Sequence, residues 1–125
     1  MSKKKILLVD DEPALTRMLR LNLEQTGRFE VREEHRGNNA LRAAREFRPD
    51  LILLDVMMPD VGGDEVAEQL KQDPTLSGIK YAFLTAIVTK RETGTGAAEI
   101  SGETFLAKPV KREELLAVVD DLLGA

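Results

Sequence analysis

The chain has 125 residues, which fits one domain, and 42% of them are hydrophobic, enough to build a substantial core. The net charge of −4 and the lack of a basic stripe with interleaved aromatic residues argue against nucleic acid as a direct partner. No cysteine is present, which excludes disulfides and thiolate metal sites, and no apolar run approaches the roughly 18 residues of a membrane span. We therefore expect one cytoplasmic domain over residues 1–125, without a membrane partner.

The first third of the chain predicts a strand, a helix and a second strand. Residues 6–9 are a continuous apolar run, typical of a strand that is buried on both faces. The sequence Asp11-Glu12-Pro13 is suited to begin a helix, and Gly27 is suited to end it. Residues 29–33 alternate between apolar and polar side chains, which indicates an edge strand with one face in water.

The middle of the chain repeats this alternation of helix and strand. An apolar stripe at helical spacing runs from Ala40 to Phe47 and stops before Pro49. Residues 51–54 form a second continuous apolar run, which predicts the third strand. Val66 and Leu70 belong to the stripe of a third helix, which we expect to end near residues 73–74.

The last third predicts two more strands, at residues 79–84 and 104–107, and a final helix with an apolar stripe from Leu115 to Leu122. Between the two strands, residues 93–96 read Thr-Gly-Thr-Gly where a fourth helix is expected. Each interior glycine costs a helix ~1 kcal/mol relative to alanine. We therefore expect this helix, which would continue into residues 97–100, to be short, late-starting or poorly ordered.

Strands that alternate with helices predict an α/β fold, with a doubly wound parallel sheet of five strands and helices on both faces. In such a sheet the carboxyl ends of the strands meet at one edge, where ligands bind. Asp10 and Asp11 follow the first strand, Asp55 follows the third, and Lys108 follows the fifth. Three carboxylates repel one another, and one lysine is not enough to offset them. The pattern therefore predicts a divalent metal ion with an anion beside it, most simply a phosphoryl group.

These strand-end residues, with a threonine after the fourth strand, resemble the receiver domain of two-component response regulators, the CheY-like superfamily. The motif residues, in chain order, are Asp10-Asp11, Asp55, Thr85-Ala86 and Lys108-Pro109. The resemblance covers essentially the whole chain. It implies a flavodoxin-like (βα)5 fold with the strand order 2-1-3-4-5. Because only Gly124 and Ala125 follow the last expected helix, we expect a stand-alone receiver without an output domain.

The resemblance also implies the chemistry of the site. Asp55 would be the phosphoryl acceptor, and Lys108 would pair with the phosphoryl group. Asp10, Asp11, Asp55 and the backbone carbonyl of Met57 would hold Mg²⁺, with Mn²⁺ as an alternative. The donor would be the phosphohistidine of a histidine kinase or of a phosphotransfer protein.

Further residues take part in the switch that the resemblance implies. The Thr85 hydroxyl and the adjacent Ala86 would contact the phosphoryl group, and Phe105 would be the switch aromatic. The Lys108-Pro109 peptide bond would be cis, which is common only before proline. The output would be a protein contact through the face formed by the fourth helix, the fifth strand and the fifth helix. The kinase, the stimulus, the output partner and the oligomeric state are not encoded in any motif.

Three other functions are compatible with parts of this pattern. A flavin-binding domain would need a loop after the first strand that attracts phosphate, but residues 10–13 carry three acidic side chains. A phosphatase with an aspartyl-phosphate intermediate would typically need a second aspartate at the position of Met57. The third alternative is a receiver-like scaffold that is not regulated by phosphorylation, which an intact set of motif residues disfavours.

Overall fold

A computed structural model describes residues 3–86, 97–100 and 102–124. Its strands are β1 (Lys4–Val9), β2 (Phe29–Glu34), β3 (Leu51–Asp55), β4 (Lys80–Thr85), β5 (Ala97–Ile100) and β6 (Glu103–Ala107). Its helices are α1 (Pro13–Glu24), α2 (Ala40–Phe47), α3 (Gly63–Gln72) and α5 (Arg112–Leu123), with a 3₁₀ turn at Gly37–Asn39. The sheet has the order β2-β1-β3-β4-β6-β5.

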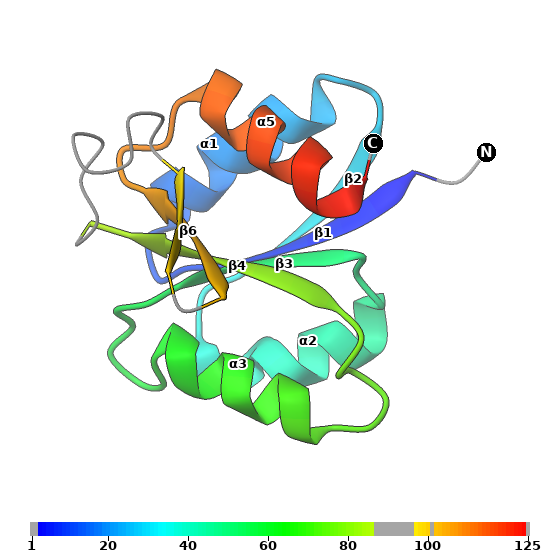
Figure 1. Ribbon diagram of the computed structural model, residues 1–125, viewed down its shortest axis with the longest axis vertical. Coiled ribbons are helices and arrows are strands. Elements are labelled where there is room, and N and C mark those ends of the chain that lie inside the picture. The colour runs from blue at the N-terminus through cyan, green and yellow to red at the C-terminus, as the bar shows by residue number, and fades with distance from the viewer. Residues whose placement is uncertain (1–2, 87–96, 101, 125) are drawn as a thin grey trace.

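The first five strands of this order run parallel, which confirms the predicted α/β sheet with the order 2-1-3-4-5. The strand β6 is the fifth strand of the prediction. Helices α1 and α5 cover one face of the sheet, and α2 and α3 cover the other (Figure 1). None of the helices in the described part of the chain is long and apolar enough to span a bilayer.

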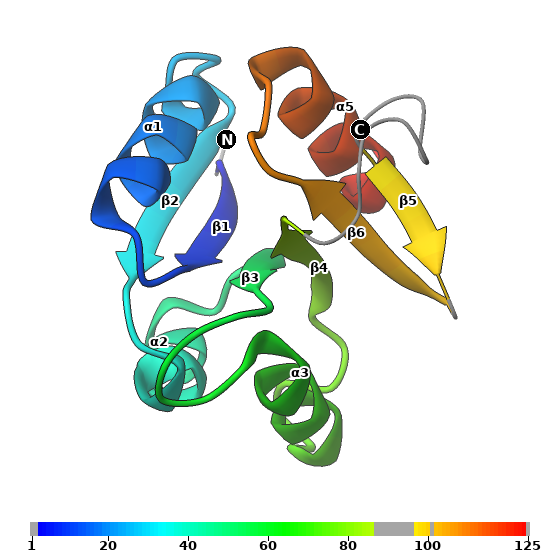
Figure 2. The ribbon, with the colours of Figure 1, turned by 90° about the vertical axis from the view of Figure 1, so that its left-hand side faces the viewer.

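The strand β5 differs from the prediction. Residues 97–100, expected to belong to a weak fourth helix, instead pair with β6 in the antiparallel direction at the outer edge of the sheet (Figure 2). Ile100 lies opposite Glu103, and Gly102 directly precedes β6. Gly102 has a φ of 80°, which suits glycine in a tight hairpin. The sequence 93–96, on which the expectation of a weak helix rested, lies outside the described residues.

The continuous apolar runs are explained by a core on both faces of the sheet. Ile6 and Leu8 of β1 pack with the helices α1 and α5, while Leu7 and Val9 pack with α2 and α3. Successive strand residues point to opposite faces, so a strand covered on both sides must be apolar at every position. β2 lies at the edge, and its alternation matches the prediction, because Phe29 is buried and Glu30 is exposed.

The contact between α3 and the end of β3 depends on a glycine. The Gly63 amide donates to the Val56 carbonyl at 3.2 Å, and a Cβ at Gly63 would collide with the backbone carbonyl of Asp55. The helix can therefore begin directly against the last residue of the strand only if that position has no side chain.

We predict that Gly63→Ala destabilises the fold, by the ~1–3 kcal/mol typical of overpacking, although alanine is the better helix former. Urea unfolding followed by circular dichroism would measure the loss. Gly78→Ala is the control, because a Cβ at Gly78 meets no atom within 4 Å. Equal stability of Gly63→Ala and wild type would mean that the close approach of α3 is not required.

Candidate functional site

The carboxyl ends of the parallel strands carry the residues that the sequence singled out. The loops after β1 and β3 run across this end of the molecule (Figure 2). A pocket of about 300 Å³ opens there. Its lining residues are Asp11, Glu12, Asp55, Met57, Ala86 and Lys108. The structure therefore brings together side chains that are up to 97 positions apart in the chain.

Three carboxylates converge at this end of the sheet, and those of Asp11 and Asp55 line the pocket. Asp10 and Asp55 are buried, with 0% and 3% of their surface exposed, whereas Asp11 is exposed. One carboxylate oxygen from each of the three lies within 4.8 Å of the others. The Asp10 amide donates to the Glu34 carbonyl and the Val56 amide to the Leu84 carbonyl, so neighbouring strands fix the ends from which the carboxylates project.

Lys108 enters this cluster from the end of β6. Its Nζ lies 2.9 Å from Asp10 Oδ2, 3.1 Å from Glu12 Oε1 and 3.3 Å from Asp55 Oδ1. Its amide donates to the Thr85 carbonyl at 2.9 Å, so the backbone of the lysine is anchored to the end of β4. The peptide bond between Lys108 and Pro109 is cis.

Burial changes the acidity of the clustered groups. Desolvation, followed by the negative charge of Asp10, raises the pKa of Asp55 to about 6, although Lys108 opposes the shift. Desolvation also raises the pKa of Asp10. Desolvation alone would lower the pKa of Lys108, but contacts with Asp10 and Glu12 outweigh it and raise that pKa. The site therefore has more negative charge than one ammonium group can stabilise.

The chemistry of the donor set fits a divalent cation. Asp10 Oδ2 is buried and accepts no hydrogen bond within the described part of the chain, since its contact with Lys108 is an ion pair without hydrogen-bond geometry. Three carboxylate oxygens this close together are typical ligands for a hard cation. Asp10, Asp11 and Asp55 could therefore hold a metal ion.

Met57 and Ala86 also line the pocket. Met57 contributes its backbone, and Ala86 contributes a small side chain. The Met57 amide donates to Asp55 Oδ1 at 3.3 Å, while 70% of the Met57 residue surface is exposed. The main chain at Met57 is thus turned toward the carboxylates, and its side chain is directed to solvent. Ala86 follows β4 and leaves space at the pocket wall.

Thr85 and Phe105 differ in their position relative to the pocket. Thr85 ends β4 and is buried, with 2% exposed. Phe105 lies two residues before the end of β6, is partly buried, and packs against the Phe83 ring at a centroid distance of 5.1 Å. The register pairs Phe83 with Phe105 and Thr85 with Ala107, so the aromatic pair lies two residues before Thr85. Phe105 is therefore close to the site but does not line the pocket.

From the sequence, Glu12 was expected to help begin a helix and to repel a flavin phosphate, and its contact with Lys108 was not predicted. In the structure Glu12 occupies the N-cap of α1, makes no side-chain cap hydrogen bond, and reaches Lys108 instead. Its position directly after Asp10-Asp11 was the available signal, because residues that leave one strand end together can face the same pocket. Asp11, expected to help begin the helix, is not the N-cap residue.

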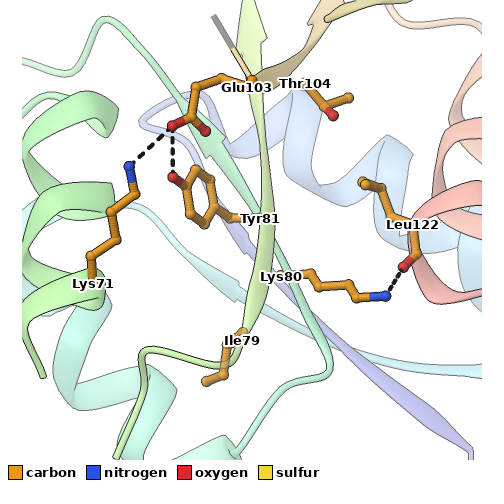
Figure 3. Close-up of a pocket in the computed structure, with 8 residues that line it drawn as sticks. Lys71, Ile79, Lys80, Tyr81, Glu103, Thr104 and Leu122 are labelled. Atoms are coloured by element: carbon orange, nitrogen blue, oxygen red, sulfur yellow. Dashed lines mark hydrogen bonds and ion pairs between the residues drawn. The ribbon is translucent and has the colours of Figure 1, made fainter. Parts of the chain in front are cut away.

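A second pocket, of about 390 Å³, lies at the opposite end of β4 and β6. Glu103 accepts from Lys71 at 3.1 Å and from the Tyr81 hydroxyl at 2.9 Å, while Lys80 donates to the Leu122 carbonyl at 2.6 Å (Figure 3). Both ammonium groups therefore already have partners within the chain. This pocket joins α3, β4, β6 and α5 but offers no convergent group for a ligand.

The parallel sheet thus carries three acidic residues and a lysine at its carboxyl edge. A family model described as the response regulator receiver domain matches residues 6–120. The chain belongs to this family. It is thus a receiver domain of the two-component response regulators.

Two curated relatives are regulatory proteins of greater length. The chain is 38% identical over 117 residues to the DNA-binding response regulator MtrA of Mycolicibacterium smegmatis, covering 94% of this chain and 49% of that protein. It is 38% identical over 120 residues to the alkaline phosphatase synthesis transcriptional regulatory protein PhoP of Bacillus subtilis, covering 96% and 48%. The chain thus spans about half the length of these relatives.

Solved structures support the same fold. The chemotaxis response regulator CheY4 of Vibrio cholerae superposes with a TM-score of 0.81 at 28% identity, covering 98% of this chain and 100% of that one. The signal receiver domain of a signal transduction histidine kinase from Syntrophus aciditrophicus gives a TM-score of 0.79 at 32% identity, covering 97% and 90%. The overall fold is therefore shared with these receivers.

The raised pKa of Asp55 predicts a measurable effect on stability. A folded-state pKa of about 6, above the ~3.9 of an unfolded aspartate, means that the carboxylate form disfavours folding. In metal-free buffer, Asp55→Asn should match wild type below about pH 4 and become more stable than wild type as the pH rises through 6, by the order of 1–3 kcal/mol. Thermal unfolding with a chelator present, from pH 4 to 8, would measure this difference.

The control for this prediction is Asp60→Asn. Hydrogen bonds from backbone amides, that of Asn38 first, lower the pKa of Asp60, so loss of its charge should give no gain in stability. Added Mg²⁺ should stabilise wild type more than Asp55→Asn, because a ligand that binds the folded state stabilises it. A wild type that is already as stable as Asp55→Asn at pH 8 without metal would contradict the prediction.

Proposed function

We propose that this receiver domain accepts a phosphoryl group on Asp55 from a phosphohistidine, in a reaction that requires Mg²⁺, and that the modification switches a protein contact. The observation that carries the proposal is the convergence of Asp11, Asp55 and Lys108 in one pocket, with the buried Asp10 directly beside them. The membership of the chain in the receiver family supports it.

The transfer is a displacement at phosphorus. A carboxylate oxygen of Asp55 forms the new P–O bond while the P–N bond to the donor histidine breaks, and the imidazole leaves with the electron pair of that bond. At pH 7 a group with a pKa of about 6 is mostly ionised, so Asp55 is available as a nucleophile without a separate base. The product is an acyl phosphate on Asp55.

The surrounding residues stabilise the negative charge of the transferred phosphoryl group. Asp10, Asp11, Asp55 and the Met57 backbone carbonyl would hold Mg²⁺ or Mn²⁺. When bound, the metal neutralises negative charge on the phosphoryl oxygens and on the carboxylates. Lys108, a compact point charge already 3.3 Å from Asp55 Oδ1, pairs with a phosphoryl oxygen. Ala86 leaves room at the pocket wall for the group.

The switch begins at Thr85. Its hydroxyl donates to a phosphoryl oxygen and draws the end of β4 toward Asp55, and Phe105 repacks in response. Phe105 lacks a hydroxyl, so its change is driven by packing against neighbours such as Phe83. Phosphorylation is best described as a shift between existing inactive and active populations. The output partner is a protein that contacts the side of the domain formed by β6 and α5, the described part of the face expected from the sequence.

We predict that Asp55→Asn abolishes phosphoryl incorporation. The amide is not a nucleophile for this reaction, so intact-mass spectrometry after incubation with acetyl phosphate and Mg²⁺ should detect no phosphorylated species. Asp60→Asn, an exposed aspartate in the next loop, should be labelled like wild type. Labelling of Asp55→Asn at another residue would reject the acceptor assignment, and an unlabelled wild type would favour a scaffold that is not regulated by phosphorylation.

We also predict that Thr85→Ala is labelled but does not switch. Loss of the hydroxyl removes the donor that draws β4 inward, while Asp55 and the carboxylates that surround it are unchanged. NMR spectra of the aromatic ring of Phe105, with and without the phosphoryl analogue beryllofluoride, would report the switch directly. In wild type the Phe105 signals should shift, whereas in Thr85→Ala they should stay near their unmodified positions; equal shifts in both would exclude the role of Thr85.

A further inference from the structure

Lys108 is held by three carboxylates that differ in their freedom to move. Asp10 and Asp55 end buried strands, and 0% and 4% of their side-chain surfaces are exposed. Glu12 makes the third contact, at 3.1 Å, with 61% of its side chain exposed. It has no side-chain cap hydrogen bond, and the only described contact of its carboxylate is with Lys108. Glu12 is therefore the one partner of the lysine that can retreat into water.

The Lys108 ammonium has few donors, so the freedom of each carboxylate to move decides which contact is given up. An ammonium group has three N–H donors and no acceptor, and here three carboxylate oxygens already surround it. Only the contacts with Glu12 and Asp55 are hydrogen bonds, while Asp10 is held as an ion pair. A phosphoryl oxygen that pairs with Lys108 therefore competes with three carboxylate oxygens for the space around one ammonium group. The buried strand ends of Asp10 and Asp55 cannot withdraw without moving the sheet, so the contact that gives way is the one with Glu12.

We propose that Glu12 is a positioning residue, which holds Lys108 in the pocket and competes with the phosphoryl group for its ammonium. This inference rests on the proposed function, because it assigns Glu12 a part in phosphoryl acceptance at Asp55. The contact with Glu12 holds Lys108 inside the pocket in the unmodified domain, and its loss is part of the cost of phosphorylation. Removing the contact should therefore make phosphorylation faster and should tighten the binding of a phosphoryl analogue.

The test compares two substitutions of Glu12, one that removes the charge of the side chain and one that shortens it. Glu12→Gln keeps the length and removes the charge, whereas Glu12→Asp keeps the charge but is one methylene too short for the contact. With saturating Mg²⁺, both should increase the rate with acetyl phosphate and the affinity for beryllofluoride, by about two- to fivefold, the range of a partly exposed ion pair. Glu30→Gln is the control, because Glu30 is exposed on β2, has no described side-chain partner, and changes the net charge equally.

A second experiment asks whether the effect of Glu12 depends on Lys108. In a Lys108→Ala background, Glu12→Gln should have no further effect, because two residues that act through one contact are not additive. A faster Glu12→Gln with a Glu12→Asp like wild type would show that charge alone acts, and would overturn the proposal. An effect of Glu12→Gln that persists without Lys108 would also overturn it.

A measurement without any phosphodonor separates this inference from the proposed function. The hydrogen exchange of the Lys108 ammonium with water, followed by NMR, should be slow in wild type and at least about twofold faster in Glu12→Gln and Glu12→Asp, again the scale of a partly exposed ion pair. Unchanged exchange would refute the role of Glu12 even if Asp55 is phosphorylated. Faster exchange in both variants, combined with an unlabelled wild type, would instead reject Asp55 as the acceptor while keeping the Glu12–Lys108 contact.

Discussion

The site depends on one electrostatic constraint, which is the burial of two carboxylates next to a single lysine. An isolated buried carboxylate is costly, and Asp10 and Asp55 are both almost fully removed from water. Lys108 lies within 3.3 Å of each, yet the pKa of both acids stays above its ordinary value. The lysine therefore reduces the repulsion without cancelling it. A cation that enters this site would reduce the remaining repulsion, which is the physical basis of the proposed dependence on a metal ion.

The fold meets this constraint with elements that are far apart in sequence. Lys108 reaches the carboxylates because its amide is bonded to the Thr85 carbonyl, which fixes the end of β6 beside the end of β4. Asp55 is held from the other side, since its strand pairs with both β1 and β4. The apolar runs that make these strands central therefore also set the distances in the pocket. The packing of the core therefore also determines the geometry of the site in this domain.

The sequence was sufficient to predict the parts that depend on local pattern. Apolar runs predicted the five parallel strands, and their ends placed Asp10, Asp55 and Lys108 at one edge. It was not sufficient for β5, because residues 97–100 have no strong preference and their state is decided by pairing with β6. Nor could it give the contact of Glu12 with Lys108 or the raised pKa of Asp55, since both depend on burial and on distances between separate strands.

The position of the aromatic residues explains how a change at Asp55 can affect a surface that lies away from the pocket. Thr85 and Phe83 lie on the same face of β4, since side chains two positions apart point the same way. Phe83 packs against Phe105 of β6 and, at 5.6 Å between ring centroids, against Tyr81. A movement of the β4 end toward Asp55 therefore acts on a row of packed rings that extends to the other end of the strand. Contact alone does not make such a row of rings a switch, because a switch requires two stable packings of Phe105. Phe105 is only partly buried, so it has the room to change its packing that the buried Phe83 lacks.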